Sequence, residues 1–181
     1  MSVQTPIDYT AIRKALVAAV QSATELTCVE EEENIQNVPR PTLPYVSFKI
    51  ITPGIKTSDD SIEYVSGTTF NRGGQRRMTV SFHCYAPSSD AAYKYMGLWQ
   101  ASLEMKAIQE ALRKKGIAVW TIGNVADLSK LLNTGYEKRT HMDVQFGISS
   151  NLTEDLGAIE TAKVDGSVDT VSQTKTVHIS V

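Results

Sequence analysis

The stretch from Ser88 to Gly116 constrains the fold most, because it reads as one long helix between two strand patterns. Ser88 offers an N-cap oxygen, and Gly116 suits the left-handed position that follows a helix. Between them apolar residues recur at spacings of three and four, so they share one face of a helix. These residues are Ala91, Tyr95, Leu98, Ala101, Met105, Ile108 and Leu112. This pattern predicts a long central helix whose apolar stripe packs on a core.

The two flanking stretches alternate between apolar and polar residues, as strands with one buried face do. In Arg77–Tyr85 the apolar positions are Met78, Val80, Phe82 and Cys84. In Tyr136–Ser149 they are Met142, Val144, Phe146 and Ile148. We therefore expect these two sets of side chains to lie together on one buried face of a sheet.

The rest of the chain supplies a first helix, further strands and an arm. A helix is predicted after Thr5-Pro6, ending near Glu25, and a strand from Tyr45 to Thr52. From Gly54 to Gly74 the chain is polar, which predicts an extended hairpin arm with Gly73-Gly74 at its turn. The whole predicts an α+β domain, in which an antiparallel β-sheet packs against an N-terminal helix and one long central helix.

The length of 181 residues fits a single domain, which we expect to span residues 1–166. Residues 167–181 are mostly Ser, Thr, Val and Gln, so we expect a polar C-terminal extension that buries too little to fold alone. Within the domain, leucines around 125–132 predict one or two helical turns, and Asn151–Gly157 predicts a polar turn.

Composition excludes several classes of protein. The net charge of −2 argues against a dedicated nucleic-acid binder, which is usually strongly basic. Two cysteines, Cys28 and Cys84, make no disulfide framework and indicate reduced thiols. The sequence shows neither a signal peptide nor an apolar run of the roughly 20 residues that span a bilayer, so we expect no membrane association.

The sequence contains no catalytic motif, and we expect no cofactor. His83 and His141 fall on the polar faces of their predicted strands, where they could approach each other and Asp143. A metal site at these three residues, or a hydrolase that uses His141 and Asp143, is one interpretation, and two histidines that are ordinary polar-face side chains are the other. No G-x-S-x-G, phosphate loop or carboxylate pair in an apolar setting accompanies them.

Two charged clusters are candidates for contacts between subunits. Arg72, Arg76 and Arg77 surround the predicted turn of the arm, and an acidic run extends from Glu30 to Glu33. Both could be ordinary solvated surface. The alternative hypothesis is that the arginines of one copy meet Glu31 and Glu32 of the next.

Three stretches carry a resemblance to a known family over residues 41–168. They are Leu43–Phe48 after its proline-rich lead, Gln75–Phe82 with the helix behind it, and Tyr136–Phe146 running on to Ala162. In these the chain resembles the phage neck terminator family, the tail-terminator-like proteins of tailed bacteriophages and prophages. Residues 167–181 lie outside the resemblance.

The resemblance implies a structural virion protein rather than an enzyme. Such proteins form rings, typically hexameric, that cap the tail tube and join the tail to the head connector, and DNA slides through the pore without specific binding. The expected partners are copies of the chain itself, tail tube and sheath proteins, and a connector or stopper protein, in virions assembled in the host cytoplasm. The alternatives are another tail-completion or baseplate ring protein, and the hydrolase described above.

Overall fold

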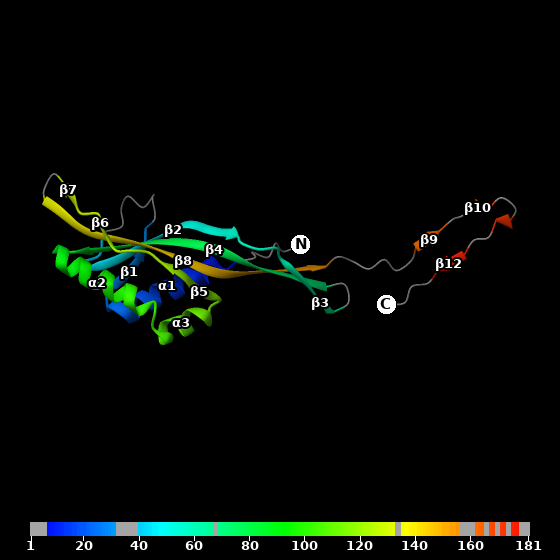
Figure 1. The fold of residues 1–181 in the computed structure, drawn as a ribbon, viewed down its shortest axis with the longest axis horizontal. Helices are drawn as coiled ribbons and strands as arrows, with labels where there is room; N and C mark the ends of the chain where they lie inside the picture. The colour runs from blue at the N-terminus through cyan, green and yellow to red at the C-terminus, as the bar shows by residue number, and fades with distance from the viewer. Residues whose placement is uncertain are drawn as a thin grey trace.

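The computed structural model of the chain describes residues 7–31, 40–66, 69–132, 135–155, 162–164, 167–168, 171–172 and 175–177. Figure 1 shows three helices gathered against one side of a long sheet, and a ribbon of strands that continues beyond them. Helices and strands of this order, with mainly antiparallel pairing, confirm the predicted α+β class.

The main sheet is built on two long central strands. Its eight strands are β1 (Thr27–Glu30), β2 (Tyr45–Lys56), β3 (Ser61–Ser66), β4 (Thr69–Ala86), β5 (Ile117–Ile122), β6 (Ala126–Asp127), β7 (Lys130–Leu132) and β8 (Gly135–Asp155). The central order is β1-β2-β4-β8-β5, with β3 beside β4 and with β6 and β7 beside β8. Neighbours are antiparallel except β1 and β2, which run parallel. Four short strands follow, paired as β9 (Ala162–Val164) with β12 (Lys175–Val177) and β10 (Ser167–Val168) with β11 (Val171–Ser172).

The first helix, α1 (Tyr9–Thr24), forms where the sequence predicts it. Its cap is Asp8, whose Oδ1 accepts a hydrogen bond of 2.9 Å from the backbone N–H of Ala11. At its other end Glu25 adopts a left-handed conformation with φ of 60°, and its N–H donates to the carbonyl of Gln21.

The prediction of one long central helix is wrong, because the chain breaks it into α2 (Ser89–Ser102) and α3 (Lys106–Arg113). After Ser102 the backbone hydrogen bonds reach back three residues and not four, as in a 3₁₀ turn. The N–H of Glu104 donates to the carbonyl of Ala101, and the N–H of Met105 donates to the carbonyl of Ser102. Met105 then adopts an extended conformation, so α3 starts in a new direction. The Ser102 hydroxyl, which donates to the carbonyl of Trp99 at 2.8 Å, competes with the regular helix at this point.

The core lies between the sheet and the helices. The eight strand residues predicted to share a buried face are all buried: Met78, Val80, Phe82, Cys84, Met142, Val144, Phe146 and Ile148. Phe82 is the centre of an aromatic cluster, with ring centroids 5.3 Å from Trp99, 6.2 Å from Phe48 and 6.5 Å from Phe146. Offset and edge-on geometries of this kind add to the stabilisation from apolar burial.

The predicted apolar face of the central helix is shifted by one residue. Leu98 and Met105 are 44% and 59% exposed, whereas the residues packed on the sheet are Ala92, Met96, Trp99 and Leu103. Near the C-terminal end of this stretch the predicted face is correct, since Leu112 is buried and Ile108 packs against the core. Both stripes have helical spacing, so the choice between them depends on the fit of Trp99 against Phe82.

The predicted arm is confirmed, with a different construction. It contains β3 and the outer halves of β4 and β8, which extend past the helices in Figure 1. Gly73 and Gly74 lie within β4 and not at a turn. β8 continues to Asp155, so residues 151–155 are strand, and the helical turns predicted around 125–132 are β6 and β7.

Candidate assembly site

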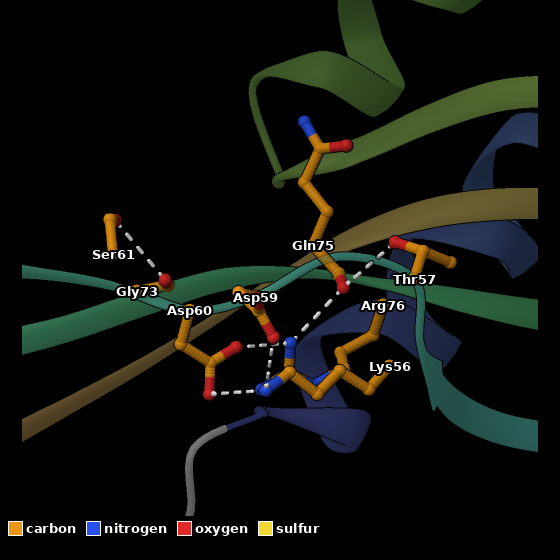
Figure 2. A network of polar contacts seen from close by, with 8 residues as sticks. All are labelled: Lys56, Thr57, Asp59, Asp60, Ser61, Gly73, Gln75 and Arg76. Carbon is orange, nitrogen blue, oxygen red and sulfur yellow. Dashed lines mark hydrogen bonds and ion pairs between the residues drawn. The ribbon is translucent and has the colours of Figure 1, made fainter.

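Ion pairs from the segment between β2 and β3 to Lys56 of β2 and Arg76 of β4 hold the root of the arm (Figure 2). Arg76 Nη1 of β4 lies 2.7 Å from Asp60 Oδ1, which precedes β3. Lys56 Nζ, at the end of β2, lies 3.5 Å from Asp59 Oδ1 and 4.0 Å from Asp60 Oδ2. The Arg76 and Asp60 side chains are each only 16% exposed, so this pair is partly shielded from water. The chain is therefore clamped where it leaves β2 to enter the arm.

Gly74 makes room for this clamp. A Cβ atom built at Gly74 would collide with the Asp60 carboxylate and lie 2.6 Å from Arg76 Nη1. The hydrogen bond from Arg76, together with the positive charges of Arg76, Lys56 and Arg72, holds the pKa of the Asp60 carboxyl below its usual range. The glycine thus serves a close approach of charged groups within a strand and not a chain reversal.

Backbone and hydroxyl hydrogen bonds complete the root. The Thr57 N–H and Oγ1 both donate to the carbonyl of Gln75, at 3.4 and 3.1 Å. The Ser61 hydroxyl donates to the carbonyl of Gly73 at 3.2 Å. Figure 2 shows these contacts on either side of the Arg76–Asp60 pair. The arm is accordingly a three-stranded ribbon tied to the body at its base.

The structure separates the three arginines predicted as a cluster. Arg76 and Arg77 are neighbours in β4, so their side chains leave opposite faces of the sheet. Arg72 lies further out on the arm and is exposed. Among the described residues Arg76 pairs with Asp60, whereas Arg72 and Arg77 make no hydrogen bond or ion pair. The signal that sequence reasoning missed is Asp60, which lies 16 residues before its partner.

Of the acidic pair predicted to contact another subunit, Glu31 is engaged within its own chain. Its Oε1 lies 2.9 Å from His83 Nδ1 and accepts a hydrogen bond from the Ser47 hydroxyl. The hydrogen bond with His83, aided by Ser47 and by the positive charges of His83 and Arg139, lowers the pKa of Glu31 from 4.5 to about 2. Glu32 lies outside the described residues.

The two strand histidines meet as predicted. His83 and His141 are directly opposite each other on β4 and β8, with ring centroids 5.1 Å apart, and His141 Nε2 lies 2.9 Å from Asp143 Oδ1. A hydrolase would need a hydroxyl or thiol on the other ring nitrogen. In the described part of the chain His141 has its hydrogen bond with Asp143 alone.

Three further observations concern possible ligands and partners. The described residues contain no group of three or more His, Cys, Asp or Glu side chains placed to hold a metal ion. No helix among them is long and apolar enough to cross a membrane. Cys28 and Cys84 are free, and burial raises the pKa of both thiols to about 12.

Among the described residues, the outer edge of β8 has no partner strand along the arm. β7, β6 and β5 pair in turn with β8 from Gly135 to Ile148. From Ser149 to Asp155 the described residues offer β8 a partner only on its other side, where β4 lies. An unpaired edge presents backbone N–H and C=O groups to any strand that can reach it.

The fold is thus an α+β domain from which a three-stranded arm projects. The sequence model of the phage neck terminator protein family matches residues 10–173 of the chain. The chain therefore belongs to the phage neck terminator family, and its role is that of a structural component of the phage tail and neck. The match begins before the predicted resemblance and extends into the C-terminal extension. A comparison with curated proteins found no match.

Proposed function

We propose that the protein is a tail terminator that forms a homo-oligomeric ring, most simply a hexamer, on the head-proximal end of the tail. The ring caps the tail tube and joins it to the head connector or a stopper protein. The observation that carries this proposal is membership of the neck terminator family over residues 10–173. Assembly then takes place in the host cytoplasm, and the finished protein resides in the virion.

The open edge and the arm support a ring. A long, unpaired strand edge is a liability in a free monomer unless a neighbour covers it. Copies placed head to tail around an axis use two different patches each, so ring closure covers every such edge. The open segment Ser149–Asp155 and the projecting β3 give each copy two separate surfaces of this kind.

Charged contacts between subunits form part of the proposal. Arg72 and Arg77 make no hydrogen bond or ion pair among the described residues, and they are the two arginines proposed to contact the adjacent copy. Arg76 and Glu31 contribute through the order they impose on their own chain, because each already has a partner there, Asp60 for Arg76 and His83 for Glu31. Glu32 is proposed as an acidic partner from the adjacent copy.

DNA passes through the proposed ring without specific binding. The chain carries a net charge of −2, and a strongly basic lumen would retain the phosphate backbone. The family's structural role and the absence of a catalytic motif in the sequence support a function without an active site.

The test is to add purified protein to tails produced without it and to image the complexes by cryo-electron microscopy. We expect a ring of cyclic symmetry at the end of the tube that faces the head. A ring at the opposite end would favour a baseplate protein, and density along the tube would favour another tail-completion protein. Tails with no added density would refute the proposal.

A further inference from the structure

The arm is a ribbon with two edges that lack a partner strand. Its strands lie in the order β3-β4-β8, because β3 pairs with one side of β4 and Ser149–Asp155 of β8 pairs with the other. Among the described residues neither β3 nor Ser149–Asp155 has a second partner. The ribbon therefore presents backbone N–H and C=O groups along both of its long sides.

Neither edge carries the residues that usually keep an edge strand from pairing. The two segments contain no proline and no lysine, and β3 pairs regularly with β4 from Ser61 to Tyr64. The described C-terminal strands do not fill these edges, since β9 pairs with β12 and β10 pairs with β11. Both edges can therefore accept a strand from another molecule.

The two edges run in the same direction. β3 is antiparallel to β4, and β4 is antiparallel to β8, so β3 and β8 are parallel to each other. Neighbouring copies in a ring of six are related by one sixth of a turn, a rotation too small to reverse a strand. The β8 edge of one copy can therefore meet the β3 edge of the next only as a parallel pair, whereas an antiparallel contact of two edges requires a two-fold dimer.

The side chains on the two edges also match. Directly paired residues share a face of a sheet, so Ile62 of β3, Arg72 of β4 and Leu152 of β8 lie on one face. The next residues on the edges, Glu63 and Thr153, lie on the opposite face. A parallel pair that sets Leu152 of one copy beside Ile62 of the next places apolar side chains together on one face. On the other face it sets Glu63 beside a neutral residue, so the contact brings no like charges together there.

We propose that the β8 edge of one copy pairs in parallel with β3 of the next copy, so that the arms of neighbouring copies join into one sheet. Main-chain hydrogen bonds would supply the attraction, and the alternating side chains would set the register. The arm extends beyond the helices of its own copy (Figure 1), so those helices do not obstruct a neighbouring arm. This inference rests on the proposed ring and specifies its interface.

Disulfide formation tests the pairing in protein bound to tails. Neighbouring strands lie about 4.8 Å apart, within the Cα separation of about 4.4–6.8 Å that a disulfide spans. Under mild oxidation we expect Glu63→Cys with Thr153→Cys to give a ladder of covalent oligomers up to the full ring. The native Cys28 and Cys84 are buried and stay unreactive. The matched control is Glu63→Cys with Leu152→Cys, which should stay monomeric because these two side chains leave opposite faces.

Two further variants separate this pairing from other arrangements. Glu63→Cys with Asn151→Cys tests the register shifted by two residues, which keeps the same faces together, and oligomers from either double variant support the inference. Thr153→Cys alone should give monomers, since a parallel contact of β8 with β3 keeps the two copies of residue 153 apart. Disulfide dimers of this single variant would show a two-fold contact between β8 edges and would overturn the inference.

Hydrogen exchange gives a readout without substitutions. When the wild-type protein binds to tails, backbone amides in both β3 and Ser149–Asp155 should exchange about tenfold or more slowly than in the free protein, because both edges become paired. Protection of only one edge would assign that edge to a different partner and overturn the inference. Rings that form on tails with neither disulfides nor protection would refute this interface and leave the proposed function intact. Wild-type protein that forms no ring on tails would instead refute the proposed function.

Discussion

Replacing Phe82 by alanine should remove the centre of the core and cost about 4 kcal/mol of unfolding free energy. Phe→Ala changes in cores cost about 3–5 kcal/mol, because burial is lost and a cavity remains. Phe82 is fully buried, and its ring centroid lies 5.3 to 6.5 Å from those of three other aromatic rings, so we expect a cost near the middle of that range. A domain is stable by only about 5–15 kcal/mol, so this single change is a large share of the total.

Thermal unfolding followed by circular dichroism measures this effect. For a domain of this size each kcal/mol shifts Tm by about 2–4 °C, so we expect a fall of about 8–16 °C. The control is Gln145→Ala, next to Val144 but on the opposite face of β8, which should change stability by about 0.5 kcal/mol or less. A Phe82→Ala variant that melts within 2 °C of wild type, on the order of 1 kcal/mol or less, would refute the assigned core.

Three further predictions follow from the corrected features of the fold. Leu98→Ala should leave Tm almost unchanged while Met96→Ala costs about 2–5 kcal/mol, and the reverse order would restore the stripe predicted from sequence. Gly74→Ala should displace the ion pair at the arm root and speed limited proteolysis of the arm. Gly73→Ala should not, because its Cβ would meet only side-chain oxygens no closer than 3.2 Å. Equal cleavage of the two variants would contradict the packing around Gly74. The pKa of Glu31 is lowered from 4.5 to about 2, so its stabilising contribution is complete above pH 4.5 and lost as the pH falls to about 2; Glu31→Gln should flatten the decline of Tm over that window, and an unchanged decline would show that Glu31 is not responsible.

The strands were predictable because one face of each is buried and the other is polar. β4 and β8 alternate in sequence as they do in burial, and their pairing brings His83 and His141 together as expected. The two-residue repeat of side chains along a strand restricts its register, since a slip of one residue would turn every apolar side chain of the strand to water.

The errors arose where tertiary packing decides between local alternatives. Around Ser88–Gly116 two adjacent apolar stripes have helical spacing, and the core buries the one that places Trp99 against Phe82. The break before Lys106 has neither glycine nor proline to signal it. The weak signal is the Ser102 hydroxyl, which bonds back to the helix.

The arm root was beyond sequence reasoning for a related reason. A glycine pair usually predicts a turn, but Gly74 is small because Asp60 and Arg76 meet beside it. Asp60 becomes the partner of Arg76 only through the pairing of β3 with β4. The subunit contacts of Arg72, Arg77 and Glu32 stay predictions, as does the division of the chain at residue 166.

The most direct test of a terminator is the phage that lacks it. Particles produced without this protein are examined by electron microscopy, and the lengths of their tails are measured against those of the wild-type phage. We expect filled heads, separate tails and a broad distribution of tail lengths, all corrected by supplying the protein from a plasmid. Joined virions with tails of uniform length would contradict it.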